Sequence, residues 1–164
     1  MEMEDGADMS EESKTIAAII KQAIAGEEDA YAVYSSAAKI VKAAGAKALL
    51  LELAKDEQGH KAKLEGLLKK GISWTIAEGQ FKRVADFKLG DHLVSKPVDE
   101  NADLQQVLTT AIQREKESHE LYSTMGSVSC DDTVRNLFEF LANEELTHKR
   151  RLEALYEEIV YKDF

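Results

Sequence analysis

The sequence predicts an all-α protein, a single four-helix bundle with a long crossover between its second and third helices. The chain has 164 residues, which is enough for one well-buried domain. It holds one proline and nine glycines, whereas a β-sandwich or barrel needs turn residues about every 8 to 12 positions. Four segments carry apolar residues at alternating steps of three and four, which is the spacing of a bundle helix.

Charge and composition exclude several classes of protein. The chain has 21 basic and 31 acidic residues, so its net charge of −10 would repel nucleic acid and anionic membranes. Cys130 is the only cysteine, which excludes a disulfide framework and fits a reducing compartment. No apolar stretch approaches the roughly 20 residues that span a bilayer. We expect a cytoplasmic protein that binds neither nucleic acid nor membrane.

An acidic arm, residues 1–12, precedes the predicted bundle of residues 13–164. The arm carries six acids and no base, unlike the positive start of a signal peptide. Ser10 can cap the first helix, which we expect to run to Ala44. Gly45 can then end that helix, because glycine readily adopts the left-handed conformation of a helix terminus.

The second helix is predicted to run to Lys69 and to stop at Gly71, with cations near its negative dipole end. Residues 72 to about 100 then lose the helical period. Their length suits a crossover that runs along the whole bundle. The crossover contains the aromatic residues and the proline that interrupt the pattern: Trp74, Phe81, Phe87 and Pro97.

The third helix is predicted to begin after Asp99 or Asn101 and to end at Gly126. The fourth is predicted to begin at Asp131 or Asp132 and to leave a short tail at the end of the chain. Short polar side chains favour these starts because they accept hydrogen bonds from the free N–H groups of a first helical turn.

The four helices form an internal repeat in which related positions lie 88 residues apart. Glutamate, histidine and tyrosine recur at this offset within the apolar stripes, so the chain reads as two related helical hairpins. Packed antiparallel, the hairpins would bring these residues to one depth of the core. The related pairs are Glu27 and Glu115, Tyr34 and Tyr122, Glu57 and Glu145, and His60 and His148.

Six of these residues are predicted to bind metal. An unpaired carboxylate in the core costs several kcal/mol, so four buried glutamates require compensating charge. Residues i and i+3 share a helix face, which lets a Glu-x-x-His pair reach one centre. One Glu from each of two helices and Glu-x-x-His from the other two form the ligand set of di-iron and di-manganese bundles. The predicted ligands are Glu27, Glu57, His60, Glu115, Glu145 and His148.

Charge predicts the number of metals. Four carboxylates and two neutral imidazoles carry −4, which two divalent cations cancel. Glu57 and Glu145 are the expected bridges. Oxygen-rich ligation with one imidazole per metal suits two Fe, with Mn or Zn possible by substitution. Tyr34 and Tyr122 are expected either to pack in the core or, the favoured interpretation, to hydrogen-bond a ligand carboxylate as supporting catalytic residues.

Three further candidates carry weaker signals. His92 lies in the crossover and is expected at the surface. His119 follows Glu115 by four residues, and helix packing is favoured over a role beside the metals. Cys130 lacks a second thiol and is interpreted as incidental.

The site motifs resemble the ferritin-like di-iron superfamily, most closely rubrerythrin, over about residues 14–157. They are Gly26-Glu27 with Tyr34, Asp56-Glu57-Gln58-Gly59-His60, Glu115, and Glu144-Glu145-Leu146-Thr147-His148. The resemblance implies a left-handed ferritin-like four-helix bundle with a long connection between helices two and three. It also implies a non-haem di-iron centre that reduces peroxide, whose diferrous iron becomes diferric and is re-reduced by a small electron carrier.

Two departures from rubrerythrin change what the resemblance implies. Rubrerythrin usually carries a rubredoxin domain with four cysteines, whereas this chain has only Cys130, so a separate rubredoxin-like partner must donate electrons. Rubrerythrin also usually has a second glutamate one turn after the first on helix three, and Ser118 stands there. Without that carboxylate the ligand set resembles the symmetric six-ligand site of bacterioferritin.

The sequence is compatible with three functions. The first is an oxidoreductase that reduces hydrogen peroxide or dioxygen and protects a cytoplasm poor in oxygen from oxidative stress. The second is a ferroxidase or iron-handling protein of bacterioferritin type, although Gln58 stands where bacterioferritin has a haem-ligating Met. The third is a non-enzymatic dimetal-binding bundle. The resemblance and the aromatic crossover together lead us to expect a homodimer.

Overall fold

The computed structural model describes residues 11–70 and 103–162. These ranges form four helices and contain no strand: α1 (Glu11–Ile40), α2 (Ala44–Lys69), α4 (Leu104–Val128) and α5 (Asp132–Lys162). The predicted all-α fold is therefore confirmed. No helix in the described ranges combines the length and the apolar character that crossing a membrane requires.

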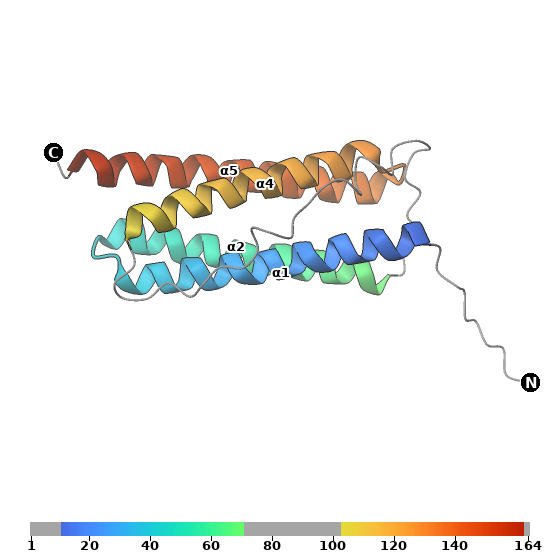
Figure 1. Cartoon of the computed structure of the whole chain (residues 1–164), viewed down its shortest axis with the longest axis horizontal. Coiled ribbons are helices and arrows are strands. Elements are labelled where there is room, and N and C mark those ends of the chain that lie inside the picture. Colours follow the sequence, from blue (N-terminus) through green and yellow to red (C-terminus); the bar gives the residue numbers. More distant parts are fainter. Residues whose placement is uncertain (1–10, 71–102, 163–164) are drawn as a thin grey trace, which may run out of the picture.

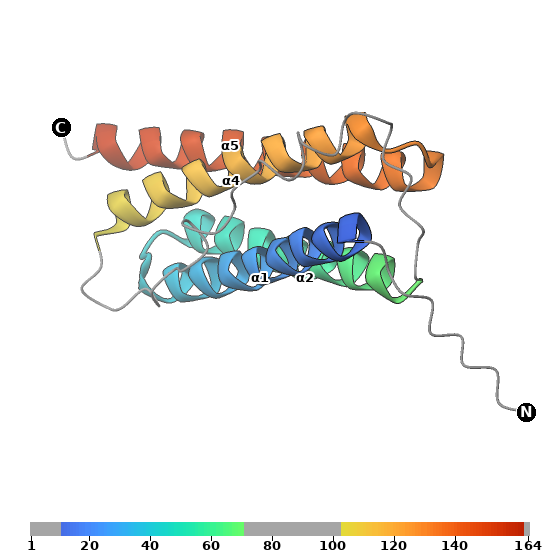
Figure 2. The ribbon, with the colours of Figure 1, turned by 45° about the vertical axis from the view of Figure 1, so that its right-hand side comes forward.

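The helices form two antiparallel hairpins, α1 with α2 and α4 with α5 (Figure 1). Seen from a second direction, the hairpins lie as two layers, one above the other (Figure 2). Packing is more extensive within each hairpin than between them, where α1 contacts α4 and α2 contacts α5. Each hairpin is one copy of the sequence repeat, so the pseudo-twofold relation places equivalent residues on opposite sides of a common core.

The connection between α1 and α2 differs from the sequence prediction. α1 ends at Ile40, earlier than the predicted Ala44. Gly45 does not end it, because α2 already begins at Ala44 and contains Gly45 in its first turn. The break comes instead from Ala43, whose extended backbone (φ −72°, ψ 124°) redirects the chain without a left-handed residue.

The end of α2 and the start of α4 are set by local hydrogen bonds. The backbone N–H of Lys70 donates to the carbonyl of Gly66, 3.2 Å away, and Lys69 lies in the last turn as expected. The α4 helix begins at Leu104 because the side chain of Asp103 accepts a hydrogen bond from the N–H of Gln105, at 2.9 Å. The predicted terminator Gly71 and the predicted caps Asp99 and Asn101 lie outside the described residues.

The second hairpin extends its helices beyond the predicted ends. α4 passes through Gly126 to Val128, because Val128 is buried and continues the apolar stripe by another turn. Asp131 caps α5, since its carboxylate accepts a hydrogen bond from the N–H of Val134 at 3.0 Å. α5 runs to Lys162, so the tail is shorter than expected, and its last turns pack Ile159 against the core.

Two apolar clusters divide the core along its length. The first cluster includes Ile20, Leu64, Tyr122 and Phe138. The second includes Tyr34, Leu50, Leu108 and Leu152. Buried charged side chains from all four helices make up the remaining buried part of the described core: Glu27, Glu57, His60, Glu115, Glu145 and His148.

Several sequence predictions fall outside the described residues. These are the crossover of residues 72–100, His92 and residues 1–10 of the acidic arm. The arm was expected to reach residue 12, but Glu11 and Glu12 already belong to α1.

Candidate metal centre

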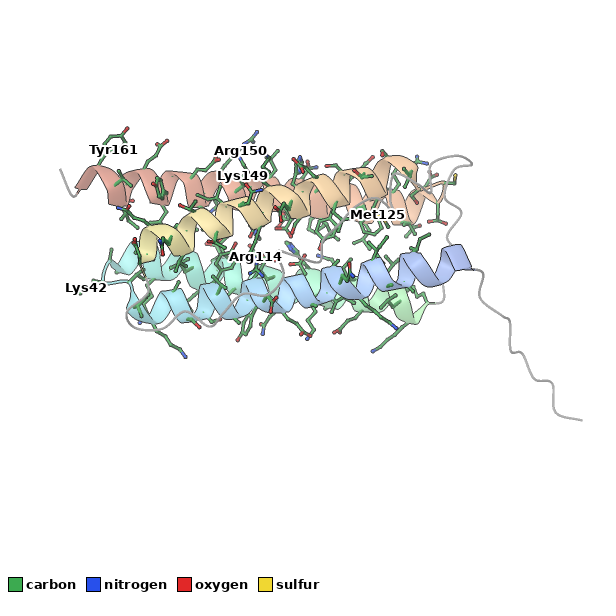
Figure 3. The ribbon with its side chains drawn as sticks, viewed as in Figure 1. Lys42, Arg114, Met125, Lys149, Arg150 and Tyr161 are labelled. Atoms are coloured by element: carbon green, nitrogen blue, oxygen red, sulfur yellow. The ribbon has the colours of Figure 1, made fainter. Side chains whose placement is uncertain are left out.

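The six predicted ligands are buried together in the middle of the bundle. None is more than 4% exposed. α1 and α4 each contribute one Glu, while α2 and α5 each contribute a Glu and a His one turn apart. Figure 3 shows the side chains that fill the space between the hairpins, Arg114 and Met125 among them, whereas Arg150 and Tyr161 point away from it.

The six residues fall into two sets that share two members. In each set, one ligand atom per residue lies within 4.8 Å of the others. Glu57 and Glu145 belong to both sets, so their carboxylates stand where bridges between two ions would stand. Each set also combines residues from both hairpins. The sets are Glu27, Glu57, His60 and Glu145, and Glu57, Glu115, Glu145 and His148.

Each histidine reaches a carboxylate of the opposite hairpin. His60 Nδ1 lies 2.9 Å from Oε1 of Glu145, and His148 Nδ1 lies 2.9 Å from Oε1 of Glu57. The two imidazole rings stack with their centroids 5.4 Å apart. The Nδ1 atoms therefore face the carboxylates, and the Nε2 atoms face the other way, toward Glu144 and Asp56.

Four of the six buried side chains have raised pKa values. Burial, with the neighbouring carboxylates, raises the pKa of Glu57 and of Glu145 well above the usual range. Burial favours a neutral His60, but its hydrogen bonds to Glu27 and Glu57 outweigh burial and raise its pKa to about 10. The pKa of His148 is raised still further for the same reason. The two shared carboxylates and the two histidines therefore favour their protonated forms.

The other two glutamates are held as anions. Burial opposes this, yet hydrogen bonds with Glu145 and His148 lower the pKa of Glu115 to about 2. The pKa of Glu27 is also lowered, because hydrogen bonds to Glu57 and His60 outweigh burial. The centre therefore has two anionic terminal carboxylates and two shared carboxylates.

The two buried tyrosines support the terminal carboxylates. Tyr34 donates a hydrogen bond to Glu115, and Tyr122 donates one to Glu27. Each tyrosine bonds the glutamate of the other hairpin because α1 and α4 run antiparallel. Burial and the adjacent carboxylates raise both tyrosine pKa values, so the hydroxyls remain protonated donors.

Two carboxylates beside the histidines were not predicted. Nε2 of His148 lies 3.2 Å from Oδ2 of Asp56, and Nε2 of His60 lies 3.8 Å from Oε2 of Glu144. Asp56 and Glu144 each precede a predicted ligand and lie 88 residues apart. The repeat offset was therefore the available signal, but a partly exposed acid next to a ligand resembles any solvated surface acid.

The remaining candidates lie outside both sets. His119 Nδ1 lies 2.7 Å from the carbonyl oxygen of Ala142, which links α4 to the backbone of α5. Ser118 is partly buried on α4, and Cys130 is exposed. Arg114 joins the hairpins through Asp29 on α1, at 3.4 Å.

The donor chemistry fits a pair of divalent ions. Carboxylate oxygens and one imidazole nitrogen per position suit Fe or Mn. With neutral histidines and ionised glutamates the six residues carry −4, and two divalent ions would neutralise this charge in a buried site.

Comparisons with known proteins agree with this architecture. A protein of Pyrococcus furiosus described as hypothetical superposes with a TM-score of 0.69 at 22% identity, covering 96% of this chain and 95% of its own. A Thermotoga maritima protein described as ferritin-like and diiron-carboxylate superposes with a TM-score of 0.61 at 20% identity, covering 87% and 95%. No curated protein matches the sequence. The rubrerythrin family model matches residues 18–156, so the chain belongs to the rubrerythrin family.

Proposed function

We propose that the chain is a non-haem di-iron oxidoreductase whose metal ligands are Glu27, Glu57, His60, Glu115, Glu145 and His148. The observation that carries the proposal is the pair of four-residue sets that share Glu57 and Glu145. Two sets with common carboxylates suit two ions held a short distance apart, whereas a structural ion needs only one closed set. Mn or Zn could substitute for Fe in the same ligands.

The proposed reaction is the reduction of hydrogen peroxide, or of dioxygen, by electrons from a separate carrier. When bound, two ferrous ions would supply the two electrons that, with two protons, convert one hydrogen peroxide to two waters, leaving both ions ferric. A rubredoxin-like protein is the proposed donor, because Cys130 alone cannot form a four-thiolate iron site. We place this activity in the cytoplasm.

The residues of this chain would hold the centre in position. Tyr34 and Tyr122 orient the terminal carboxylates across the hairpin interface and keep their own protons. The Nδ1 atoms of His60 and His148 face inward, as ligand atoms would. The apolar clusters at either end keep water away, which strengthens each charge interaction in the site.

A second candidate is a ferroxidase or iron-handling protein of bacterioferritin type, in which iron is the substrate. Ser118 favours it, because a serine one turn after Glu115 supplies no carboxylate as a seventh ligand. Under this candidate the oxidised iron would leave the site and further ferrous iron would be consumed. A non-enzymatic dimetal bundle is the third candidate and would react with neither oxidant.

Anaerobic stopped-flow mixing distinguishes the three candidates. Diferrous protein is mixed with hydrogen peroxide or with dioxygen, and the ferric product is then treated with reduced rubredoxin. Oxidation of both ions, retention of both, and their re-reduction support the oxidoreductase. Release of ferric iron with continued consumption of ferrous iron would support the ferroxidase, and failure to react would reject both activities.

We also propose that Ser118 slows the reaction with peroxide. In that case Ser118→Glu should raise the rate constant for peroxide oxidation of the diferrous protein, because a carboxylate would offer a further ligand on that side of the centre. Ser118→Ala is the matched control. A wild type that reacts at least as fast as Ser118→Glu would contradict this role.

We propose further that the chain forms a homodimer. Sedimentation velocity of the full chain tests this at several concentrations. A monomer at all concentrations, or a particle of many subunits, would contradict a dimer, and the large particle would favour the ferroxidase.

A further inference from the structure

Along the interface between α2 and α5, the two halves of the sequence repeat carry different residues at equivalent positions. Four contacts follow one another there, from α2 to α5. In order, they are Glu52 with Arg151, Asp56 with His148, His60 with Glu144, and Lys63 with Phe140. The pseudo-twofold relation exchanges the first contact with the fourth and the second with the third. Equivalent positions therefore hold different residues. Asp56 corresponds to Glu144 and Lys63 to Arg151, which differ in length and shape, and Glu52 corresponds to Phe140, which differs in charge.

The outer ring nitrogen of His148, Nε2, has a carboxylate partner. Its Nε2 lies within hydrogen-bonding distance of Asp56, at 3.2 Å. One turn away, Arg151 makes two hydrogen bonds to Glu52, at 2.8 and 3.1 Å. The hydrogen bonds to Glu52 raise the pKa of Arg151, and Asp56 adds a smaller contribution. Asp56 thus lies near the fixed Arg151 cation, and its carboxylate is within reach of His148 as a hydrogen-bond acceptor.

The outer ring nitrogen of His60, also Nε2, lacks such a partner among the described residues. Its Nε2 lies 3.8 Å from Glu144, beyond hydrogen-bonding distance, and has no hydrogen-bond partner among the described residues. His60 is nevertheless only 2% exposed, so water does not readily replace the missing acceptor. The equivalent of the Arg151 ion pair is Lys63, which lies 4.3 Å from the centre of the Phe140 ring.

An acceptor on the outer nitrogen changes what an imidazole can do as a ligand. An imidazole that binds metal through Nδ1 carries its proton on Nε2. A carboxylate that accepts this proton fixes the tautomer, holds the ring plane and makes the ligating nitrogen more basic. Loss of such a partner typically lowers metal affinity by about 10- to 100-fold. His148 has this partner and His60 does not.

We propose that Asp56 is a positioning residue that makes the metal position at His148 the tighter of the two, while the position at His60 holds its ion more weakly. This inference rests on the proposed dinuclear site. At less than one metal per chain, the ion should therefore occupy the His148 position.

Stepwise metal titration tests the inference. Metal-free protein is titrated anaerobically with Fe²⁺ alone, and free and bound iron are measured at each step. The wild type should bind two ions with dissociation constants that differ by about 10- to 100-fold. Asp56→Asn should weaken the tighter step and bring the two constants together, because an amide oxygen is a weaker acceptor than a carboxylate.

Two substitutions of the equivalent residue complete the test. Glu144→Gln is the matched control and should leave both constants little changed, since Glu144 makes no hydrogen bond to His60. Glu144→Asp restores the repeat, because the shorter carboxylate of Asp56 reaches His148 from the equivalent position. It should strengthen the weaker step, by up to about tenfold. A gain in affinity cannot result from a loss of folding.

The outcomes separate this inference from the proposed function. Two ions of equal affinity, equal losses in Asp56→Asn and Glu144→Gln, or an unchanged weaker step in Glu144→Asp would each overturn the inference and leave the dinuclear site intact. Binding of fewer than two ions by the wild type would overturn the dinuclear site and the inference with it.

Discussion

At the scale of single residues, the tyrosine hydroxyls are the groups whose removal is most informative. Tyr34→Phe and Tyr122→Phe each delete one hydrogen bond to a buried carboxylate and change little else. A hydrogen bond to a charged group contributes about 1.5 to 3 kcal/mol, so each variant should lose about that much free energy of unfolding. Urea unfolding of the metal-free protein measures the loss.

The control for this prediction is Tyr31→Phe, on the same helix as Tyr34. Tyr31 is 38% exposed, so loss of its hydroxyl should be nearly neutral. Losses of similar size in all three variants would contradict a special role for the buried hydroxyls.

The protonation of His60 predicts how the stability of the metal-free protein depends on pH. Its pKa rises from 6.5 to about 10 on folding, so its stabilising contribution is complete below pH 6.5 and is lost as pH rises through 10. The free energy of unfolding should fall across this window. The groups that face His60 are Glu27 from α1, Glu57 from α2, and Glu144, Glu145 and His148 from α5.

Urea unfolding at a series of pH values measures this dependence. His60→Gln should flatten part of the profile, while His119→Gln, in which the changed histidine lies outside both ligand sets, should retain it. An alkaline profile that is the same in His60→Gln and in the wild type would show that His60 does not hold this proton.

At the scale of helices, the sequence predicted the stripes better than the ends. The stripes follow from burial, which acts on every third or fourth residue and repeats after 88 positions. The ends depend on single backbone conformations. Gly45 and Gly126 are typical terminators, yet both lie inside helices, because Ala43 makes the first break and buried Val128 extends α4.

The candidate site shows the same contrast: residues within an apolar stripe could be predicted from the sequence, whereas contacts that depend on packing could not. Glu57 and His60 stand out because they interrupt an apolar stripe, and their repeat makes chance improbable. Asp56 interrupts no stripe, since its side chain is 34% exposed. Its contact with His148 depends on how one hairpin lies against the other, and the spacing within a helix does not contain that information.

Capping of α5 gives a prediction at this scale. Asp131→Ala removes the acceptor of the Val134 N–H and should cost about 0.5 to 2 kcal/mol of stability. Asp132→Ala is the matched control, because its side chain is 86% exposed and takes part in an ion pair with Arg135 that is worth less. Thermal melting of both variants measures the difference. A greater loss of stability in Asp132→Ala than in Asp131→Ala would contradict the assignment of Asp131 as the cap of α5.

At the scale of the whole molecule, the candidate metal centre is where residues of the two hairpins come together. Packing within each hairpin is extensive, and fewer contacts join α1 to α4 or α2 to α5. Each candidate ligand set draws residues from both hairpins, so a bound ion would connect them. The same residues also join the hairpins directly, through the contacts of His60 with Glu145 and of His148 with Glu57.

Metal removal should therefore lower the melting temperature of the whole bundle. Ions that bind only the folded state stabilise it by mass action, by about 2.7 kcal/mol for one site at a free concentration 100 times the dissociation constant. Scanning calorimetry of metal-free and Fe²⁺-loaded protein under anaerobic conditions measures the shift. Glu57→Gln should lose most of it, because the changed side chain belongs to both ligand sets. Glu139→Gln, an exposed change on α5, should retain it. Equal melting temperatures with and without iron would mean that the junction between the hairpins does not bind metal, since an ion held by residues of both hairpins must resist their separation.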